Sequence, residues 1–240
     1  MLRARGQNLA QDRGWLALLH YKSGRSQADG PGFFLAPTGK SDPEAELEAT
    51  LRAFFEETSQ NQQAESKSQR PEAEHLTRFS ARQSAQCRFP ARFHWLKQRL
   101  AFEEKHLPQQ SCGRFDQWRD TIDAAGVTLI FADAFIANPA SMYGHTFLRL
   151  RRRASEADGS LLDYTINFAG TPDTENALFY ALKGIYGAFP GNYSTMPYYM
   201  KVQEYGSIES RDLWEYDLNL SSETVSQLVR HAWEMGGTYF

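Results

Sequence analysis

The chain has 240 residues, of which 41% are hydrophobic and 23% are charged, and its formal net charge is −3. This composition is typical of a globular protein with at least one sizeable core. The one marked cationic run is residues 151–153, so the charge pattern gives little support to nucleic-acid binding. No apolar stretch approaches the ~18 residues that a membrane-spanning helix requires.

Residues 1–56 are predicted to form a small N-terminal α/β segment. A stretch rich in Gly and Ser separates the apolar runs at residues 15–21 and 33–36, which favours two short strands. A helix is predicted to begin at Asp42, because an aspartate N-cap followed by proline is a helix start signal. Its apolar face consists of Leu47, Leu51, Phe54 and Phe55. Residues 57–86 carry few apolar side chains and are interpreted as a polar linker or disordered loop.

Residues 87–119 are rich in aromatic side chains, and we interpret them as an aromatic helical cap. The spacing of apolar residues from Phe93 to Leu100 predicts a helix. The two cysteines of the chain, Cys87 and Cys112, fit no common zinc-binding pattern, so no metal site is expected. In an oxidising compartment a disulfide between them would contribute about 3 kcal/mol. Two buried free thiols are the alternative.

Residues 120–240 are predicted to form an α+β domain, in which helices pack on an antiparallel sheet. Three apolar runs bounded by turn formers predict a meander. These runs are residues 127–132, 144–150 and 161–168. The second run alternates, so that His145, Phe147 and Arg149 share one face. Two helices and a further extended segment complete the prediction. The helices are residues 175–185 and 221–235, and the extended segment is residues 198–220.

His145 is the leading candidate for catalysis. It follows Gly144 at the predicted start of a strand, directly after the irregular residues 138–143. An imidazole titrates near neutral pH and can act as a general base, whereas capping of loop carbonyls would be a purely structural role. For the five other histidines, a surface or satisfied structural role is the default interpretation.

A nucleophile for His145 is not evident in the chain. Ser141 lies four residues earlier, yet the G-x-S-x-G turn of serine hydrolases is absent, so a serine hydrolase is the weakest interpretation. Cys87 and Cys112 belong to the aromatic cap and look structural. The nucleophile is therefore missing, or it lies outside these 240 residues.

Charged and aromatic side chains alternate along residues 198–205 and 209–216. Such charges could form a polar network that steers His145, but cross-strand ion pairs would give the same pattern. The tyrosines of residues 186–199 could line an apolar channel or form a packed lid without a ligand.

Five segments form an ordered set in the second half of the chain. They are Asn138-Pro139-Ala140-Ser141-Met142-Tyr143-Gly144-His145-Thr146, Asn167-Phe168-Ala169, Gly184-Ile185-Tyr186-Gly187, Tyr199-Met200-Lys201-Val202-Gln203-Glu204-Tyr205 and Arg211-Asp212-Leu213-Trp214-Glu215-Tyr216. Together they resemble the bacterial DUF4105 family, also called the Lnb N-terminal periplasmic domain. The resemblance implies a circularly permuted papain-like (NlpC/P60-type) core, in which a strand-borne His precedes the Cys nucleophile. The family's Asn-Cys-Ser-type motif would fall after Phe240, so we expect a fragment that lacks both its signal segment and its thiol.

The function that this resemblance implies is envelope-associated, cysteine-dependent acyl transfer, of the lipoprotein N-acyltransferase or amidase type. His145 would take the proton of the thiol, and Asn167 or Glu204 would orient the imidazole. Binding roles are expected for Ser141, Tyr143, Tyr193, Tyr199 and Arg211. The implied substrate is phospholipid or lipoprotein, in the periplasm or cell envelope near the membrane, and no cofactor is implied. The alternative is a noncatalytic periplasmic module that contacts a partner or lipid through residues 186–199.

Overall fold

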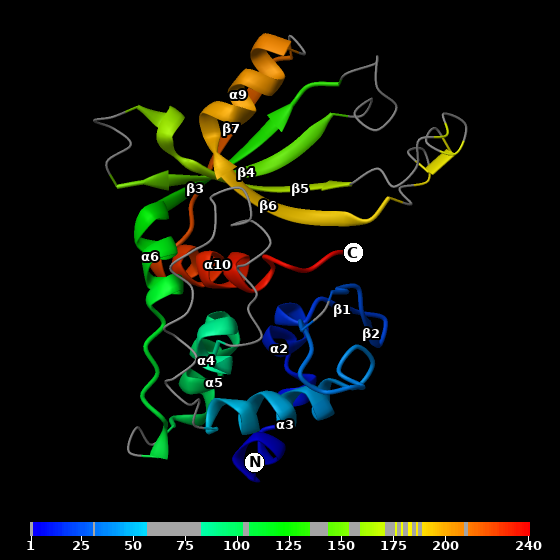
Figure 1. Cartoon of the computed structure of the whole chain (residues 1–240), viewed down its shortest axis with the longest axis vertical. Coiled ribbons are helices and arrows are strands. Elements are labelled where there is room, and N and C mark those ends of the chain that lie inside the picture. Colours follow the sequence, from blue (N-terminus) through cyan, green and yellow to red (C-terminus); the bar gives the residue numbers. More distant parts are fainter. Residues whose placement is uncertain are drawn as a thin grey trace, which may run out of the picture. The chain divides into compact units, whose positions relative to one another are not determined.

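The structure is a computed structural model of the chain (Figure 1). It describes residues 2–30, 32–56, 83–102, 106–134, 144–153, 159–170, 176, 179, 182–183, 186, 189–208 and 211–240. Within these residues the chain divides into two compact units. Unit 1 comprises residues 1–116 and 230–240, and unit 2 comprises residues 117–229.

Unit 1 begins with short helices and not with the predicted strands. Its first elements are α1 (Leu2–Gly6), the 3-10 helix η1 (Leu9–Gln11), α2 (Arg13–Leu18), β1 (Tyr21–Lys22) and β2 (Arg25–Ser26). The prediction of strands at residues 15–21 and 33–36 is wrong. The Asp12 side chain caps α2 by accepting a hydrogen bond from the Gly14 amide at 2.7 Å, and a short apolar run fits a helix as well as a strand. In the second run the amides of Leu35 and Ala36 donate to the Glu46 carboxylate, so they are not available to a sheet.

α3 (Pro43–Phe54) begins where the N-cap signal predicts. The Asp42 Oδ1 atom accepts hydrogen bonds from the amides of Glu44 and Ala45, at 3.1 and 2.9 Å. Three of the four predicted core residues of this helix are buried, namely Leu47, Leu51 and Phe54. Phe55 lies just past the last helical residue and is 40% exposed, so its assignment to the buried face is wrong.

The aromatic region contains α4 (Ala85–Arg88) and α5 (Pro90–Leu100), which confirms the helix predicted from Phe93 to Leu100. Cys87 and Cys112 form a disulfide, which decides between the two alternatives for these cysteines. The indole Nε1 of Trp233 donates to the Cys87 carbonyl at 2.9 Å. Cys87 is buried in unit 1, whereas Cys112 is half-buried.

Loss of this disulfide is expected to lower the free energy of unfolding by about 3 kcal/mol. The bond closes a loop in the unfolded chain and so reduces the conformational entropy of the unfolded state. The sequence separation between the two cysteines is 25 residues. Urea unfolding of the oxidised and reduced protein measures the difference. A double variant, Cys87→Ser with Cys112→Ser, should match the reduced protein and should not respond to reductant. A loss below about 1 kcal/mol would contradict the expectation.

A buried ion cluster lies at the centre of unit 1. The Arg92 side chain is fully buried, and its Nη1 atom donates to Glu46 Oε1 at 2.9 Å. Glu234 is also fully buried, and its Oε1 atom accepts from the amides of Ala91 and Arg92, at 2.7 and 2.9 Å. The carboxylate thus caps the first turn of α5. Burial raises the pKa of Glu46, and the Arg92 charge opposes this shift.

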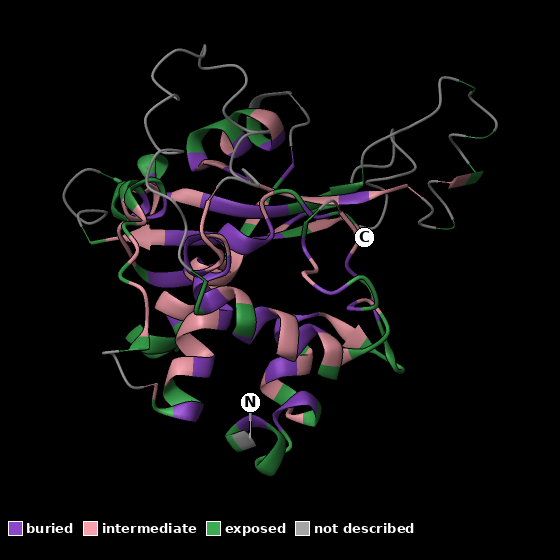
Figure 2. Ribbon diagram, turned by 60° about the horizontal axis from the view of Figure 1, so that its bottom comes forward, coloured by how far each residue is buried: buried purple, intermediate pink, exposed green. Residues whose placement is uncertain are grey.

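Unit 2 is built on an antiparallel sheet, which confirms the predicted α+β class. In the described residues its five strands lie in the order β6-β5-β4-β3-β7. They are β3 (Ala124–Ala132), β4 (His145–Arg152), β5 (Tyr164–Gly170), β6 (Gly191–Pro197) and β7 (Leu213–Leu218). The predicted meander corresponds to β3, β4 and β5. Figure 2 shows buried residues running through the strands.

Helical elements accompany the sheet. They are α6 (Gly113–Ile122), the 3-10 helix η5 (Ser160–Leu162), α9 (Tyr198–Val202), the π-helix η6 (Gln203–Ile208) and α10 (Ser222–Glu234). α10 confirms the helix predicted at residues 221–235. The extended segment predicted at residues 198–220 is correct only for β7. Residues 198, 202 and 205 recur at helical spacing and pack their side chains toward the sheet, so α9 and η6 form instead. Of the helix predicted at residues 175–185, only residues 176, 179 and 182–183 are described.

Candidate active site

His145 is the first residue of β4, and its ring faces that of Tyr205 in η6. α9 lies over the same sheet (Figure 1), and its Tyr198 packs with Phe147 and Tyr205. In the register of β3 and β4, His145 stands opposite Ala132. Ala132 belongs to a buried hydrophobic cluster. It consists of Ile130, Ala132, Phe147, Tyr198 and Tyr205. The half-buried imidazole therefore lies at the border of a packed core, and the strand fixes its position.

Asn167 on the neighbouring strand β5 holds the imidazole. The Oδ1 atom of this buried side chain lies 2.6 Å from Nε2 of His145. Because an amide oxygen can only accept a hydrogen bond, Nε2 carries the proton and Nδ1 carries the lone pair. The Asn167 amide nitrogen in turn lies 3.5 Å from the hydroxyl of Ser194, its partner in the register of β5 and β6. The contact thus selects the tautomer whose Nδ1 atom can accept a proton.

Two aromatic rings flank the imidazole. The rings of Phe147 and Tyr205 each have their centroid 6.2 Å from that of His145. The two aromatic rings also stack on each other, with centroids 5.8 Å apart. Rotation of the imidazole would disturb this packing, so the rings reinforce the orientation that Asn167 imposes.

The surroundings lower the pKa of His145 below its ordinary value of 6.5. Burial is the main cause, and the hydrogen bond with Asn167 opposes it. The charges of Lys201 and Arg211 lower the pKa further, whereas the Glu204 carboxylate raises it. A lowered pKa keeps the imidazole neutral at neutral pH. Neutral imidazole is the form that a general base requires.

Gly144 gives the chain its entry into β4. Its φ angle of +84° lies in the left-handed region, which favours glycine. A Cβ atom at this position would lie 2.7 Å from the Phe131 ring and 2.9 Å from the carbonyl oxygen of Ala132. A side chain here would therefore displace the start of the strand and with it His145.

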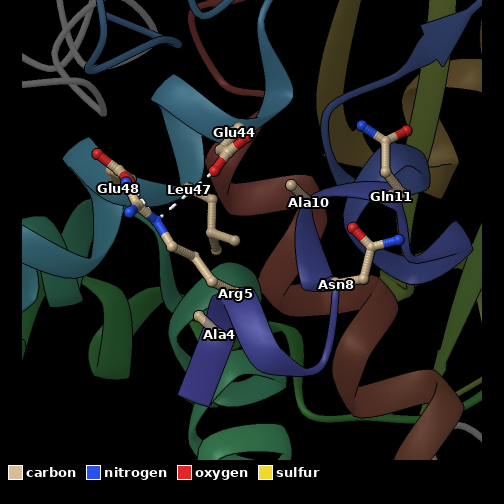
Figure 3. Close-up of a pocket in the computed structure, with 8 residues that line it drawn as sticks. All are labelled: Ala4, Arg5, Asn8, Ala10, Gln11, Glu44, Leu47 and Glu48. Atoms are coloured by element: carbon tan, nitrogen blue, oxygen red, sulfur yellow. Dashed lines mark hydrogen bonds and ion pairs between the residues drawn. The ribbon is translucent and has the colours of Figure 1, made fainter. Parts of the chain in front are cut away.

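A pocket of about 290 Å³ lies in unit 1 and does not involve His145. It is lined by Ala4, Arg5, Asn8, Ala10, Gln11, Glu44, Leu47 and Glu48 (Figure 3). The Arg5 guanidinium points at Glu44 and Glu48 and pairs with both carboxylates. The pocket therefore offers a ligand mainly the side-chain amides of Asn8 and Gln11, which gives no basis for catalysis.

The family model of the Lnb N-terminal periplasmic domain matches residues 114–240. The chain belongs to this family. A second model, a domain of unknown function (DUF7843), matches residues 7–70. No curated protein and no solved structure matches the chain.

The Lnb family places the domain in the periplasm, where a disulfide such as Cys87–Cys112 is stable. In the described part of the chain, no helix has the length and apolar character needed to cross a membrane. Over the same residues, no cluster of three or more His, Cys, Asp and Glu side chains is arranged to hold a metal ion.

In this Lnb-family domain, the two residues expected to orient His145 make different contacts. Asn167 makes the hydrogen bond, whereas the Glu204 carboxylate pairs with Lys201 Nζ at 2.8 Å. Glu204 therefore acts on His145 through its charge. Lys201 is buried, with Nζ 5.1 Å from the centroid of the Tyr205 ring.

The residues expected to bind a ligand lie in different environments. Arg211 is buried, donates to the main-chain carbonyls of Ala132 and Asp133, and lies 4.7 Å above the Tyr205 ring. Tyr193 is half-buried, with its ring 4.9 Å from that of Phe168, and Tyr199 is 46% exposed. Ser141 and Tyr143, the other two residues of this set, lie outside the described residues.

Tyr205 is the site residue that the sequence analysis did not single out. Its ring contacts His145 on one side and lies close to two cations, Lys201 and Arg211. The helical spacing of residues 198, 202 and 205 was the available signal. It would have placed this ring on the same face as Tyr198.

Proposed function

We propose that this domain supplies the general base of a cysteine-dependent acyltransferase or amidase of the bacterial envelope. The contact of 2.6 Å between Asn167 Oδ1 and His145 Nε2 carries the proposal. A histidine held through one nitrogen by an asparagine, with the other nitrogen open to a thiol, is the arrangement of Cys-His-Asn enzymes. The antiparallel sheet that presents both residues on neighbouring strands supports a papain-like core, permuted so that His precedes the thiol.

The proposed nucleophile is a cysteine carried by residues after Phe240. The two cysteines of the chain are joined to each other and provide no thiol. The family resemblance supports this placement, because family members carry an Asn-Cys-Ser-type motif after the helix that corresponds to α10.

The proposed reaction has two steps. Nδ1 of His145 takes the thiol proton, and the thiolate attacks the carbonyl carbon of an acyl ester or amide. A thioester forms, and the leaving alcohol or amine takes the proton from the imidazolium. In the second step an amine or water attacks the thioester, which regenerates the thiol and releases the acylated amine or the acid. Phospholipid as acyl donor and a lipoprotein amine as acceptor are the substrates that the resemblance favours.

The test replaces Asn167 with alanine in the full-length gene product. The rate of formation of a hydroxylamine-labile thioester, measured with labelled phospholipid vesicles, is expected to fall about 10- to 100-fold, because the imidazole loses its fixed tautomer. Since the hydrogen bond raises the pKa of His145, its loss should also move the acid limb of the pH profile to lower pH. Asn192→Ala, on the neighbouring strand β6, is the matched control.

A wild-type rate and an unchanged pH profile in Asn167→Ala would overturn the proposal. If phospholipid binding is instead lost in Tyr199→Ala, while His145 and Asn167 can be replaced without effect, the domain is a noncatalytic binding module. Tyr199 suits this comparison because its side chain is exposed.

A further inference from the structure

His20 and His231 form a close pair in unit 1. Their Nε2 atoms lie 2.9 Å apart, and the two rings stack with centroids 5.0 Å apart. At this distance one nitrogen donates and the other accepts a hydrogen bond. The hydrogen bond between the two rings can therefore form only while the pair carries at most one positive charge.

The charged groups around the pair belong to several elements. On α10, Glu234 Oε2 lies 3.3 Å from Nδ1 of His231. On α5, the guanidinium charge of Arg92 opposes a positive charge on His20. The Glu46 carboxylate of α3 pairs with Arg92. Tyr21, next to His20 in the chain, donates its hydroxyl to a main-chain carbonyl.

A second proton on the pair falls on His20, because the carboxylate faces the other ring. Burial, the neighbouring His231 and the charge of Arg92 together lower the pKa of His20 from 6.5 to about 4. Any state in which His20 is exposed binds that proton more tightly. The paired state therefore loses stability as the pH falls from 6.5 toward about 4.

The pair lies against residues 235–240, which we call the latch segment. The Phe240 ring packs edge-on against His20, with centroids 5.0 Å apart. Tyr239 and Asp29 exchange two main-chain hydrogen bonds, of 2.6 and 2.9 Å. Gly30 permits this approach, because a Cβ atom there would lie 2.7 Å from the carbonyl oxygen of Gly237. The last two residues of the latch segment thus contact Asp29 and His20, whereas Met235 and Thr238 are buried.

We propose that the His20–His231 pair is an acid-sensitive latch, which holds residues 235–240 while it shares one proton and releases them when both rings are protonated. Double protonation places an N–H on each of the two facing nitrogens and two cations beside buried Arg92. Separation of the rings relieves both conflicts. It also moves His20 away from the Phe240 ring, while the two main-chain hydrogen bonds at Asp29 stay in place.

The experiment follows amide and imidazole NMR signals of the 240-residue protein from neutral pH to below about 4. The amide signals of Asp29 and Tyr239 are expected to shift with the same midpoint as the His20 ring. In His20→Gln the side-chain amide keeps a hydrogen bond but gains no charge, so this midpoint should disappear. His231→Gln should behave in the same way. His94→Gln, which replaces a histidine outside the pair, should leave the transition unchanged.

Three results would overturn the latch. The Asp29 and Tyr239 amides could keep their native signals while His20 titrates, or both glutamine variants could open at the wild-type midpoint. The third is a coincident loss of the amide signals of β4, such as Phe147, because acid would then unfold the whole protein and not only the segment. The wild-type titration alone decides the first and third results, so the test does not depend on folding of a variant.

Discussion

Replacement of Arg92 with alanine is expected to destabilise the protein by about 3–5 kcal/mol, the range for removing one partner of a buried ion pair. The substitution leaves Glu46 and Glu234 as carboxylates that are fully buried without their common cation. It also removes the guanidinium from between two aromatic rings, those of Phe33 and Phe89, whose centroids lie 4.4 and 4.2 Å from it. Burial, which already raises the pKa of Glu46, would then be unopposed by Arg92.

Arg99→Ala is the matched control for Arg92→Ala, because Arg99 lies on the same helix. Its side chain is half exposed and its carboxylate partner, Asp12, is 3.7 Å away, so its loss should cost less than about 1 kcal/mol. The free energy of unfolding in urea measures both effects. Equal losses in the two variants would show that the buried cluster adds nothing beyond a surface pair.

The buried cluster could not be predicted from the sequence. Its members lie at positions 46, 92 and 234, and charged residues at such positions are normally exposed. Nothing in the local pattern distinguishes Arg92 from its exposed neighbour Arg99. The burial of Arg92 results from the tertiary arrangement, in which carboxylates from two other helices and the Phe33 carbonyl converge on its guanidinium.

The part of the site that depends on strand periodicity was predictable. Alternation along residues 145–149 placed His145 and Phe147 on one face, and the register of the sheet agrees. Asn167 was named as an orienting residue from the family resemblance. The sequence alone did not decide between Asn167 and Glu204. The sheet register brings Asn167 diagonally next to His145, whereas Glu204 pairs with Lys201 on its own helical segment.

Two of the errors in secondary structure share one cause. The apolar run after Trp15 and the segment after Tyr198 are short and mix aromatic with aliphatic residues, so neither helical nor strand periodicity dominates. Weak local signals decided both cases in the structure. Asp12 caps the first run as a helix, and the second follows Pro197, which ends β6 and serves as the N-cap of α9.

Replacement of His145 with alanine is expected to give the largest kinetic effect, about 10²- to 10⁴-fold on the rate of thioester formation, the contribution of a positioned general base. The wild-type imidazole is neutral at neutral pH because burial lowers its pKa, so it can take the thiol proton there. Without it the thiol must ionise unaided, near its ordinary pKa of about 8.5, and the rate should then rise with pH. The measurement is the pH dependence of thioester formation in the full-length gene product.

The controls for His145→Ala separate loss of the base from loss of the fold. His94→Ala removes a half-buried histidine of unit 1 that contacts Gln98 and should keep the wild-type rate. His145→Gln retains a polar group on β4 but no basic nitrogen, so it should be as slow as His145→Ala while unfolding at the wild-type urea concentration. Added imidazole should restore part of the rate to the alanine variant, because the space beside Asn167 is then open. A His145→Ala enzyme with more than about a tenth of the wild-type rate would exclude His145 as the base.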